Sequence, residues 1–578
     1  MTLVLENRQQ LAAPQRLDAM PPGRLLPTIE RVMETLVEDA PPERALRLAT
    51  PALPPSPVLQ SRALVERNPR SPTALARLAQ AELVADHLDD AQRSARAALE
   101  QTYKYPDAAA ALAAAVVLIS CGESAEAEQA LARLGPESSG LVLFAGLAAE
   151  RGDFDSAEER LRSEDSVDAC NLRGWIALQR QDFAQAIHYF RRATRESGPT
   201  PASLTNLGLA HAALGQRRRA IKETRQALAL APSRRTRVGI NLAWYYLFGG
   251  DIPEALNVLR GLQRTAPTDV EPVFAEARVQ LSVGDRDGAL RILRRARTRL
   301  WAHMTPVQQA ELIANLAFVQ WHRKEISAQE VIALVTTELR RVDYASLRIA
   351  NMLPPLTRRF SDLERFSSVL AHVGRAHYGD PLYSLEVHHS LLERRFEDAM
   401  QAAVRWAEDT IFDAEAATTC TSLLCDVGGQ YEAAAELGKA ALDRMPSAFL
   451  LRNNVAYALA LSGRAAEARE YLDPSIGNAP HIATDGLVAL RSGDIEQAQA
   501  CYQGAMRVAS EHGDDDLAAL VLLHAHVAFT QFAPAAQPIG SMSDIELSEG
   551  WRDDVRFAVA LHMLERLDID PPPGFPTQ

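Results

Sequence analysis

The residues best suited to metal or acid–base chemistry in this chain are its 14 histidines, 5 cysteines and 74 carboxylates. Three pairs of histidines lie close together in the sequence: His372 and His377, His388 and His389, and His524 and His526. On a helix these spacings of five, one and two residues point the two side chains of a pair in different directions, whereas helical metal sites favour a spacing of four. The histidine pattern therefore predicts no metal site.

Motifs for phosphate binding or catalysis are also missing. The Gly438-Lys439 pair lacks the glycine five residues earlier that a phosphate loop requires, and the chain has no GxGxxG, HExxH or GxSxG motif. The cysteines form no CxxC pair, so neither a disulfide framework nor a zinc site is indicated (Cys121, Cys170, Cys420, Cys425 and Cys501). We expect no cofactor and no catalytic residue. An unrecognised enzyme site could be built only in the irregular middle, from Trp301, Trp321, His372, His377 and Tyr378.

The elements that would position functional residues repeat along the chain. Residues 201–232 contain a large residue, a Leu-Gly pair, a second glycine, two alanines and a final proline, which are Leu204, Leu207, Gly208, Gly215, Ala220, Ala227 and Pro232. These residues and their spacing resemble the tetratricopeptide repeat, a helix–turn–helix unit of about 34 residues. The resemblance implies pairs of antiparallel helices, A and B, stacked in a superhelix.

An alanine recurs at the place of Ala220 with a nearly constant step of 29–36 residues. It is found at Ala91, Ala127, Ala157, Ala186, Ala255 and Ala289, and again at Ala399, Ala434, Ala468 and Ala498. The gap between the two series divides into three similar steps if Gln329 and Leu363 take the equivalent positions. We therefore expect about thirteen helix pairs over residues 72–510, two of them degenerate.

The fold predicted from this pattern is all-α, a right-handed α-α superhelix with an irregular N-terminal arm and C-terminal capping helices. Small residues in both helices let the two backbones approach closely. A glycine followed by a polar residue, as in Gly250-Asp251 and Gly284-Asp285, ends one helix and starts the next. The aromatic content of 6% also favours packed helices over β-sandwiches.

Both ends and the middle differ from the regular repeats. We expect a proline-rich arm and capping helix at 1–71, a first repeat lobe at 72–300, a degenerate helical linker at 301–385, a second lobe at 386–510, and capping helices with a flexible tail at 511–578. Single helices are expected at 28–38, 58–67, 515–529 and 553–567, and the apolar run 108–119 is expected to be a buried helix because it is too short to span a bilayer.

Helix A of a tetratricopeptide unit lines the concave groove, and asparagines at its sixth position resemble those that hold the backbone of a bound peptide in related families. Here they are Asn206, Asn241, Asn315 and Asn454, with Arg237 as a nearby cation. An amide suits this role because it donates and accepts hydrogen bonds. An asparagine can also stand there only because it is common in the repeat, and this alternative stays open. The lysine and asparagine of a carboxylate clamp are not matched, since Thr205 and Leu209 replace them.

Basic residues gather in one stretch. Residues 178–300 carry 21 basic and 10 acidic side chains, a net charge of +11, so the remaining residues carry −24 of the total of −13. In the repeat frame six arginines lie on the outer face of helix B: Arg191, Arg192, Arg225, Arg291, Arg294 and Arg295. They are candidates for a ridge that binds an acidic protein surface, or they are simply solvated.

The composition and the resemblance together point to an interaction protein. The net negative charge disfavours nucleic acid as a partner, no segment predicts membrane insertion, and the N-terminus carries no secretory signal, so we expect a cytoplasmic, bacterial-type protein. The leading hypothesis is a non-enzymatic scaffold or adaptor that binds a peptide or protein segment in the groove as a subunit of a larger complex. The alternative is a ligand- or peptide-responsive regulatory subunit of a transcription, defence or signalling system, acting through a separate effector chain with 301–385 as a hinge.

Overall fold

The structure is a computed structural model of the 578-residue chain. It describes residues 57–132 except 85–86, 106 and 122; residues 142, 145–146 and 148–149; and residues 153–575 except 231–234, 378–380, 474, 537–538, 546 and 549. The arm helix expected at 28–38 lies outside the described residues. Within them all regular structure is helical, and the helices form two compact units.

The smaller unit, called unit 2, covers the described residues from 57 to 212 and residues 218–230. Its described helices are α2 (Pro57–Arg67), α3 (Pro72–Val84), α4 (Leu88–Thr102), α5 (Ala108–Ser120), α6 (Ser124–Ala132), α8 (Phe154–Leu161), α9 (Val167–Gln179), α10 (Phe183–Ser197), α11 (Pro201–Ala213) and α12 (Arg217–Leu230), the last two of which border unit 1. The apolar helix expected at 108–119 is α5, and its described middle, Ala110–Leu118, is buried. Across the described part of the chain no helix is long and apolar enough to cross a membrane.

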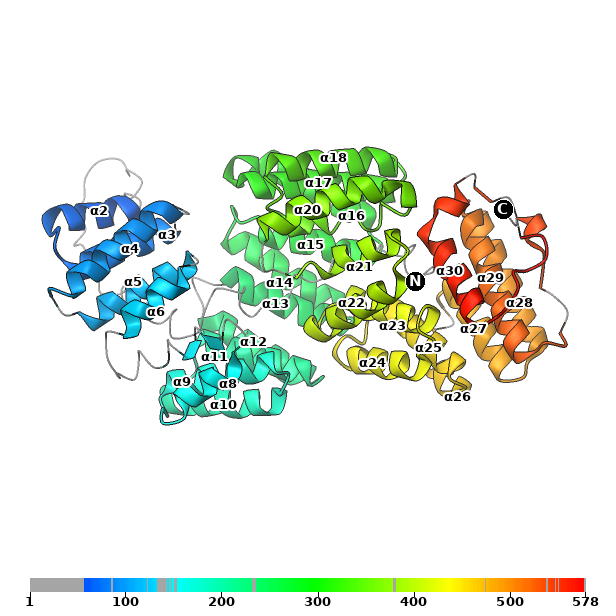
Figure 1. Cartoon of the computed structure of the whole chain (residues 1–578), viewed down its shortest axis with the longest axis horizontal. Helices are drawn as coiled ribbons and strands as arrows, with labels where there is room; N and C mark the ends of the chain where they lie inside the picture. Colours follow the sequence, from blue (N-terminus) through cyan, green and yellow to red (C-terminus); the bar gives the residue numbers. More distant parts are fainter. Residues whose placement is uncertain are drawn as a thin grey trace. The chain divides into compact units, whose positions relative to one another are not determined.

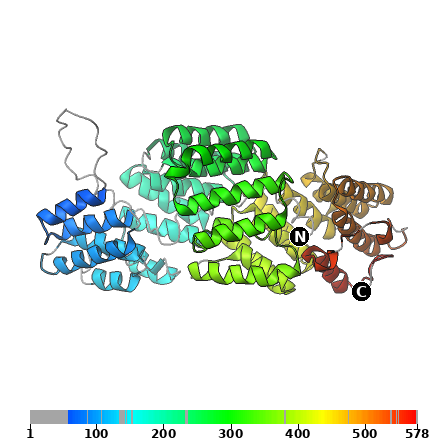
Figure 2. The same ribbon diagram turned by 90° about the horizontal axis from the view of Figure 1, so that it is seen from above.

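The larger unit, called unit 1, covers residues 213–217 and the described residues from 235 to 575. Its described helices begin with α13 (Arg235–Phe248), α14 (Ile252–Thr265), α15 (Glu271–Ser282), α16 (Arg286–Leu300), α17 (Pro306–His322), α18 (Ala328–Arg341), α19 (Leu347–Ala350), α20 (Leu363–Ala376), α21 (Tyr383–Leu392) and α22 (Phe396–Asp409). They continue with α23 (Ala414–Asp426), α24 (Tyr431–Arg444), α25 (Phe449–Leu461), α26 (Ala465–Ala468), α27 (Ala479–Arg491), α28 (Ile495–Glu511), α29 (Asp515–Phe532) and α30 (Val555–Arg566). Each pair packs on the next, as the rows of α13–α18 in Figures 1 and 2 show.

The recurring alanine marks the closest contact in each helix pair. All eleven alanines of the two series have an exposed fraction of 0%. The small partner in helix A is equally constrained, because a Cβ atom at Gly174 would lie 2.7 Å from the Phe190 ring and one at Gly208 would overlap the Thr224 hydroxyl oxygen. The predicted packing of small residues is therefore confirmed.

The turns between helices have the predicted chemistry. Asp251 and Asp285 cap α14 and α16, each accepting a hydrogen bond from the backbone N–H three residues on. Gly250 and Gly284 before them have φ of +79°, the left-handed region that side chains disfavour. Lys324 adopts the same conformation, with φ of +59°, between α17 and α18.

The expected frame is wrong in the middle of the chain. Gln329 is exposed and Leu363 is only half-buried, so neither takes the place of the packed alanine. In the regular repeats the packed alanine is the fourth residue of helix B, as Ala289 is in α16. The fourth residues of α18 and α20 are Val331 and Phe366, and they are buried in the same way, with exposed fractions of 0% and 2%. The longer α17 and the 3-10 turn before it shift the frame.

The second degenerate repeat has almost no helix A. After the single turn of α19, Pro354 and Pro355 cannot continue a helix, and residues 352–357 run through the interior as a buried irregular segment. We call residues 351–362 the strap. Its end bonds to the C-terminal region: the N–H of Val555 donates to the Arg358 carbonyl oxygen at 2.9 Å, and the N–H of Ser361 donates to Asp553 Oδ1 at 3.0 Å.

The C-terminal helices α29 and α30 match the helices expected at 515–529 and 553–567. They pack on each other (Figure 1), and α30 also reaches back to earlier helices, with the Phe396 and His562 rings 5.0 Å apart. The sequence predicts a flexible tail here, but the Phe575 ring packs edge-on against Trp551 with ring centroids 5.1 Å apart.

The division into units also differs from the expected lobes. The boundary lies near residues 213–233, and the segment 301–385 belongs wholly to unit 1. Its helices α17 and α20 pack on α16 and α21, so this segment continues the stack and the strap ties it to residues 553–555.

Candidate protein-interaction surfaces

Side chains that meet across an intervening helix identify the inner side of the curved stack in unit 1. Neighbouring A helices touch directly, but residues two A helices apart can converge only on the inside of the curve. Arg348 of α19 meets Glu271 of α15 although α17 lies between them, and Tyr457 of α25 meets His524 of α29 although α27 lies between them. Two polar clusters are therefore placed on the inner surface.

The first inner cluster is a charged group at the start of the A helices. Arg348 Nη1 lies 3.0 Å from Glu271 Oε2 and 3.1 Å from Glu311 Oε2, and the Ser346 hydroxyl donates to Glu311 Oε1 at 2.8 Å. Glu311 is buried, so its charge needs these partners. The cluster fixes the short α19 to the helices α15 and α17.

Arg278 adds a second cation close to this cluster. Burial, together with the nearby positive charge of Arg348, lowers its pKa to about 10, so it stays charged at neutral pH. Glu271 and Arg278 stand at repeat positions 2 and 9, which face the groove as position 6 does. Position 6 alone predicts the asparagines and does not identify Glu271 and Arg278. Positions 2 and 9 of the same repeat pattern would have identified both.

The second inner cluster joins α23, α25 and α29. The Tyr457 hydroxyl lies 3.3 Å from Asp426 Oδ1 and 3.2 Å from His524 Nδ1. Asp426 and His524 are buried, whereas Tyr457 is half-buried. Burial lowers the pKa of His524, partly offset by the negative charge of Asp426, and burial raises that of Tyr457 well above its usual value. Both rings are therefore neutral at physiological pH.

The four predicted asparagines fall on both units and differ in their contacts. Asn454 Nδ2 donates to the Thr418 carbonyl oxygen at 3.1 Å, and Asn315 Nδ2 donates to the Glu311 carbonyl oxygen of its own helix at 2.7 Å. Asn206 of unit 2 and Asn241 of unit 1 are buried, with exposed fractions of 3% and 8%, and their amides make no hydrogen bond to another described residue. Arg237, one turn before Asn241, is exposed.

The six predicted ridge arginines also divide between the units. In unit 2, Arg191 and Arg225 are exposed, and Arg192 pairs with Asp165 and Glu196 at 3.3 and 3.0 Å. In unit 1, Arg291, Arg294 and Arg295 lie on the exposed side of α16 and form no ion pair within the described ranges. The predicted ridge arginines of unit 1 thus all lie on one helix, α16.

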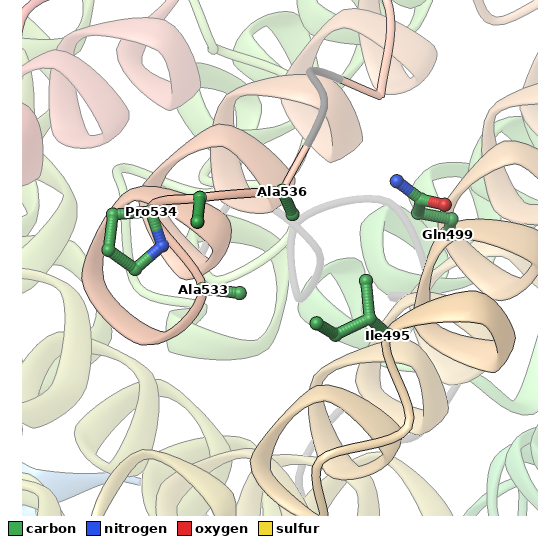
Figure 3. Close-up of a pocket in the computed structure, with 6 residues that line it drawn as sticks. Ile495, Gln499, Ala533, Pro534 and Ala536 are labelled. Carbon is green, nitrogen blue, oxygen red and sulfur yellow. The ribbon is translucent and has the colours of Figure 1, made fainter.

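A shallow hollow lies near the C-terminal end of unit 1. It has a volume of about 360 Å³ and is lined by the start of α28, including Ile495 and Gln499, and by the loop Ala533–Ala536 that follows α29 (Figure 3). Gln499 is the one side chain in this lining that carries a polar group. The hollow therefore offers no converging groups for chemistry.

The histidines of the suggestive pairs have separate structural partners. His388 lies 2.9 Å from the Thr357 hydroxyl of the strap, and His389 lies 2.8 Å from the Ser367 hydroxyl. His211 is buried, as expected for a core histidine. Among the described residues no group of three or more histidine, cysteine, aspartate or glutamate side chains could hold a metal ion.

Comparison with known families identifies repeats along the chain. Two tetratricopeptide repeat models match, one at residues 143–201, 171–235 and 427–481, the other at 236–260 and 271–295. None of the curated proteins matches the chain.

The chain also shows similarity to several solved structures. The structure of the APC/C hetero-tetramer Cut9-Hcn1 has 12% sequence identity and a TM-score of 0.45, with 89% of this chain and 90% of that chain covered. PilW, a type IV pilus biogenesis factor, has 17% sequence identity and a TM-score of 0.29, with 33% of this chain and 91% of that chain covered. Pseudomonas aeruginosa pilF has 18% sequence identity and a TM-score of 0.27, with 37% of this chain and 94% of that chain covered.

The matched repeats coincide with helix pairs whose alanines are fully buried, such as Ala220, Ala255 and Ala289. The family is one of protein-interaction scaffolds that generally lack catalytic activity. The chain therefore contains tetratricopeptide repeats, at residues 143–260, 271–295 and 427–481.

Proposed function

We propose that this protein is a non-enzymatic scaffold that binds an extended segment of a partner protein along the inner faces of its A helices, as a subunit of a larger complex. The observation that carries the proposal is the state of Asn206 and Asn241. Both residues lie on helix A with exposed fractions of 3% and 8%, and neither side-chain amide makes a hydrogen bond to another described residue. These amides are therefore available to a ligand, and a bound peptide backbone would supply both a donor and an acceptor.

The inner clusters support the same proposal. Glu271, Arg278 and Arg348 present charges of both signs beside the A helices, and such groups give a groove selectivity for the side chains of its ligand. The strap favours a fixed groove over a hinge, because its bonds to Asp553 and Val555 hold the degenerate segment in place. The scaffold function is therefore preferred to the ligand-responsive regulator.

The test is recovery of the partner by full-length protein carrying Asn206→Ala or Asn241→Ala, which examine the two units separately. We expect each variant to recover about tenfold less partner than the wild type, because each removes a bidentate contact to the peptide backbone. Recovery is measured by quantitative mass spectrometry after affinity capture at matched expression.

The matched control is Asn257→Ala, which removes an exposed amide from the outer helix α14 and should leave recovery unchanged. If Asn206→Ala and Asn241→Ala recover as much partner as Asn257→Ala and the wild type, groove binding is contradicted. An additional variant with Arg294→Glu and Arg295→Glu tests the proposed basic surface on α16, which we expect to contribute when the partner presents an acidic face.

A further inference from the structure

The positions of the protons in the second inner cluster follow from its geometry. An ionised carboxylate only accepts hydrogen bonds, so the Tyr457 hydroxyl proton must point to Asp426 Oδ1, 3.3 Å away. The same hydroxyl oxygen must then accept a hydrogen bond from His524 Nδ1, 3.2 Å away. His524 therefore carries its proton on Nδ1, and its Nε2 atom is a bare acceptor.

This acceptor is buried without a partner. His524 has an exposed fraction of 8%, and Nε2 makes no hydrogen bond in the structure. The lowered pKa of His524 agrees with a neutral ring whose Nε2 lone pair is available. Only a ligand that brings an N–H or O–H donor can satisfy this atom.

Two more polar side chains on the same helix faces also lack partners. Thr419 lies two turns before Asp426 on α23, and Asn453 lies one turn before Tyr457 on α25. Their Oγ1 and Oδ1 atoms are buried and make no hydrogen bond, and the two residues have exposed fractions of 3% and 5%. The inner surface here thus has several groups that a bound segment would satisfy.

The charge around the cluster favours a cation. Asp426 is the last residue of α23, where the helix dipole adds negative potential, and residues 383–578 carry 13 basic and 30 acidic side chains, a net charge of −17. A guanidinium already lies beside the cluster, because Arg566 of α30 donates to the Cys425 carbonyl oxygen at 3.4 Å.

We propose that the inner face of α23, α25 and α29 binds a basic segment of the partner protein, with a lysine or arginine side chain donating to His524 Nε2 and pairing with Asp426. Tyr457, which is half-buried, forms the open edge of this site. The proposal rests on the scaffold function above and adds the chemical class of the bound segment.

The experiment titrates full-length protein into three fluorescein-labelled ten-residue peptides and follows fluorescence anisotropy at low salt. One peptide alternates lysine and glycine, the second has every lysine N-acetylated, and the third has glutamate in place of lysine. We expect the lysine peptide to bind at least about tenfold more tightly than either of the others, because only it supplies cationic N–H donors. These comparisons use the wild-type protein and need no variant to fold.

Asp426→Asn keeps the shape of the side chain but removes its charge, so we expect about fivefold or greater loss of affinity for the lysine peptide. Tyr457→Phe removes the hydroxyl group that keeps the His524 proton on Nδ1, so we expect a smaller loss of affinity for the lysine peptide. The control is Asp443→Asn, which removes the same charge from an exposed position on the outer helix α24 of the same region. It should change affinity less than about twofold, because long-range attraction is screened by salt.

Three results would each overturn the basic-segment proposal. The first is that the lysine peptide does not bind at all, the second is that it binds no more tightly than the acetyl-lysine peptide, and the third is that Asp426→Asn and Asp443→Asn change its affinity equally. The scaffold function would survive any of these results if partner recovery still depended on Asn206 and Asn241. Conversely, selective lysine-peptide binding with partner recovery independent of both asparagines would retain this site and reject the asparagine groove.

Discussion

Single residues set both the packing of the helix pairs and the chemistry of their ends. The buried alanines and the left-handed glycines act locally, so each can be recognised from its own repeat. Buried ionisable residues behave differently, because their properties depend on what covers them. Asp413, the N-cap of α23, shows this: its carboxylate accepts hydrogen bonds from the N–H groups of Glu415 and Ala416 at 2.9 and 3.2 Å, yet it is buried.

Asp413→Asn should stabilise the protein at high pH. Burial, with the nearby charge of Glu415, raises the pKa of Asp413 to about 7, well above its value in the unfolded chain. A carboxyl whose pKa is raised by folding contributes stability that is present below about pH 4 and is lost as pH rises through about 7. Asparagine caps a helix equally well and does not titrate, so at pH 8 the variant should gain about 1–3 kcal/mol relative to the wild type.

The measurement is urea unfolding of both proteins at pH 5 and pH 8, with the difference between variant and wild type taken at each pH. Taking the difference cancels the titration of all other groups. A difference that is the same at both pH values would show that Asp413 ionises normally in the folded protein.

At the scale of elements, the strap is the part of unit 1 that departs most from the repeat. It replaces helix A of a degenerate repeat, and its bonds reach almost two hundred residues along the chain to the start of α30. The sequence marks the departure through Pro354 and Pro355 and the lost alanine. It does not indicate the partner, since no repeat rule relates residue 361 to residue 553.

Cutting the strap should loosen α30. Asp553→Ala removes the carboxylate that accepts hydrogen bonds from both the N–H and the hydroxyl group of Ser361. Loss of two hydrogen bonds at a partly exposed site costs about 1–2 kcal/mol, so amide exchange in α30 should become about tenfold faster. Hydrogen exchange with mass spectrometry resolves this helix from its neighbours.

The control for this experiment is Asp570→Ala, an exposed carboxylate four residues beyond the end of α30. It should leave exchange in α30 unchanged. Unaltered exchange in Asp553→Ala would mean that the bonds between Ser361 and Asp553 do not hold α30 in place.

At the scale of the whole molecule, unit 1 has contacts that a simple solenoid lacks. The Ser447 hydroxyl, between α24 and α25, donates to the Leu247 carbonyl oxygen at 2.8 Å, and its N–H donates to the Phe248 carbonyl oxygen at 3.2 Å. The Phe248 ring also stacks on Phe412 with centroids 6.2 Å apart. Stacked repeats normally touch only their neighbours, so these contacts couple the first helix of unit 1 to repeats far along the chain.

Phe412→Ala should therefore separate the unfolding of α13 from that of α23 and α24. In the wild type we expect these helices to exchange their amides with similar free energies, because opening one breaks the contacts of the others. The variant removes a buried ring and costs about 3–5 kcal/mol, and exchange in α13 should accelerate although the substitution lies far away in sequence.

Phe529→Ala is the matched control, since it removes a buried ring of α29 that packs on the Tyr502 ring, whereas the Phe248 ring stacks on Phe412. It should accelerate exchange in α28 and α29 and leave α13 unchanged. Equal behaviour of α13 in both variants would contradict the proposed coupling.

The sequence by itself determined the repeat, the helix pairs, the small residues between them and the caps, because these depend on contacts within about 35 residues that recur in each unit. The tertiary structure alone decided the division near residues 213–233, the strap and the two inner clusters. Asp426, Tyr457 and His524 span nearly a hundred residues and stand in three different A helices. Their meeting depends on the curvature accumulated over successive repeats, and local periodicity contains no measure of that curvature.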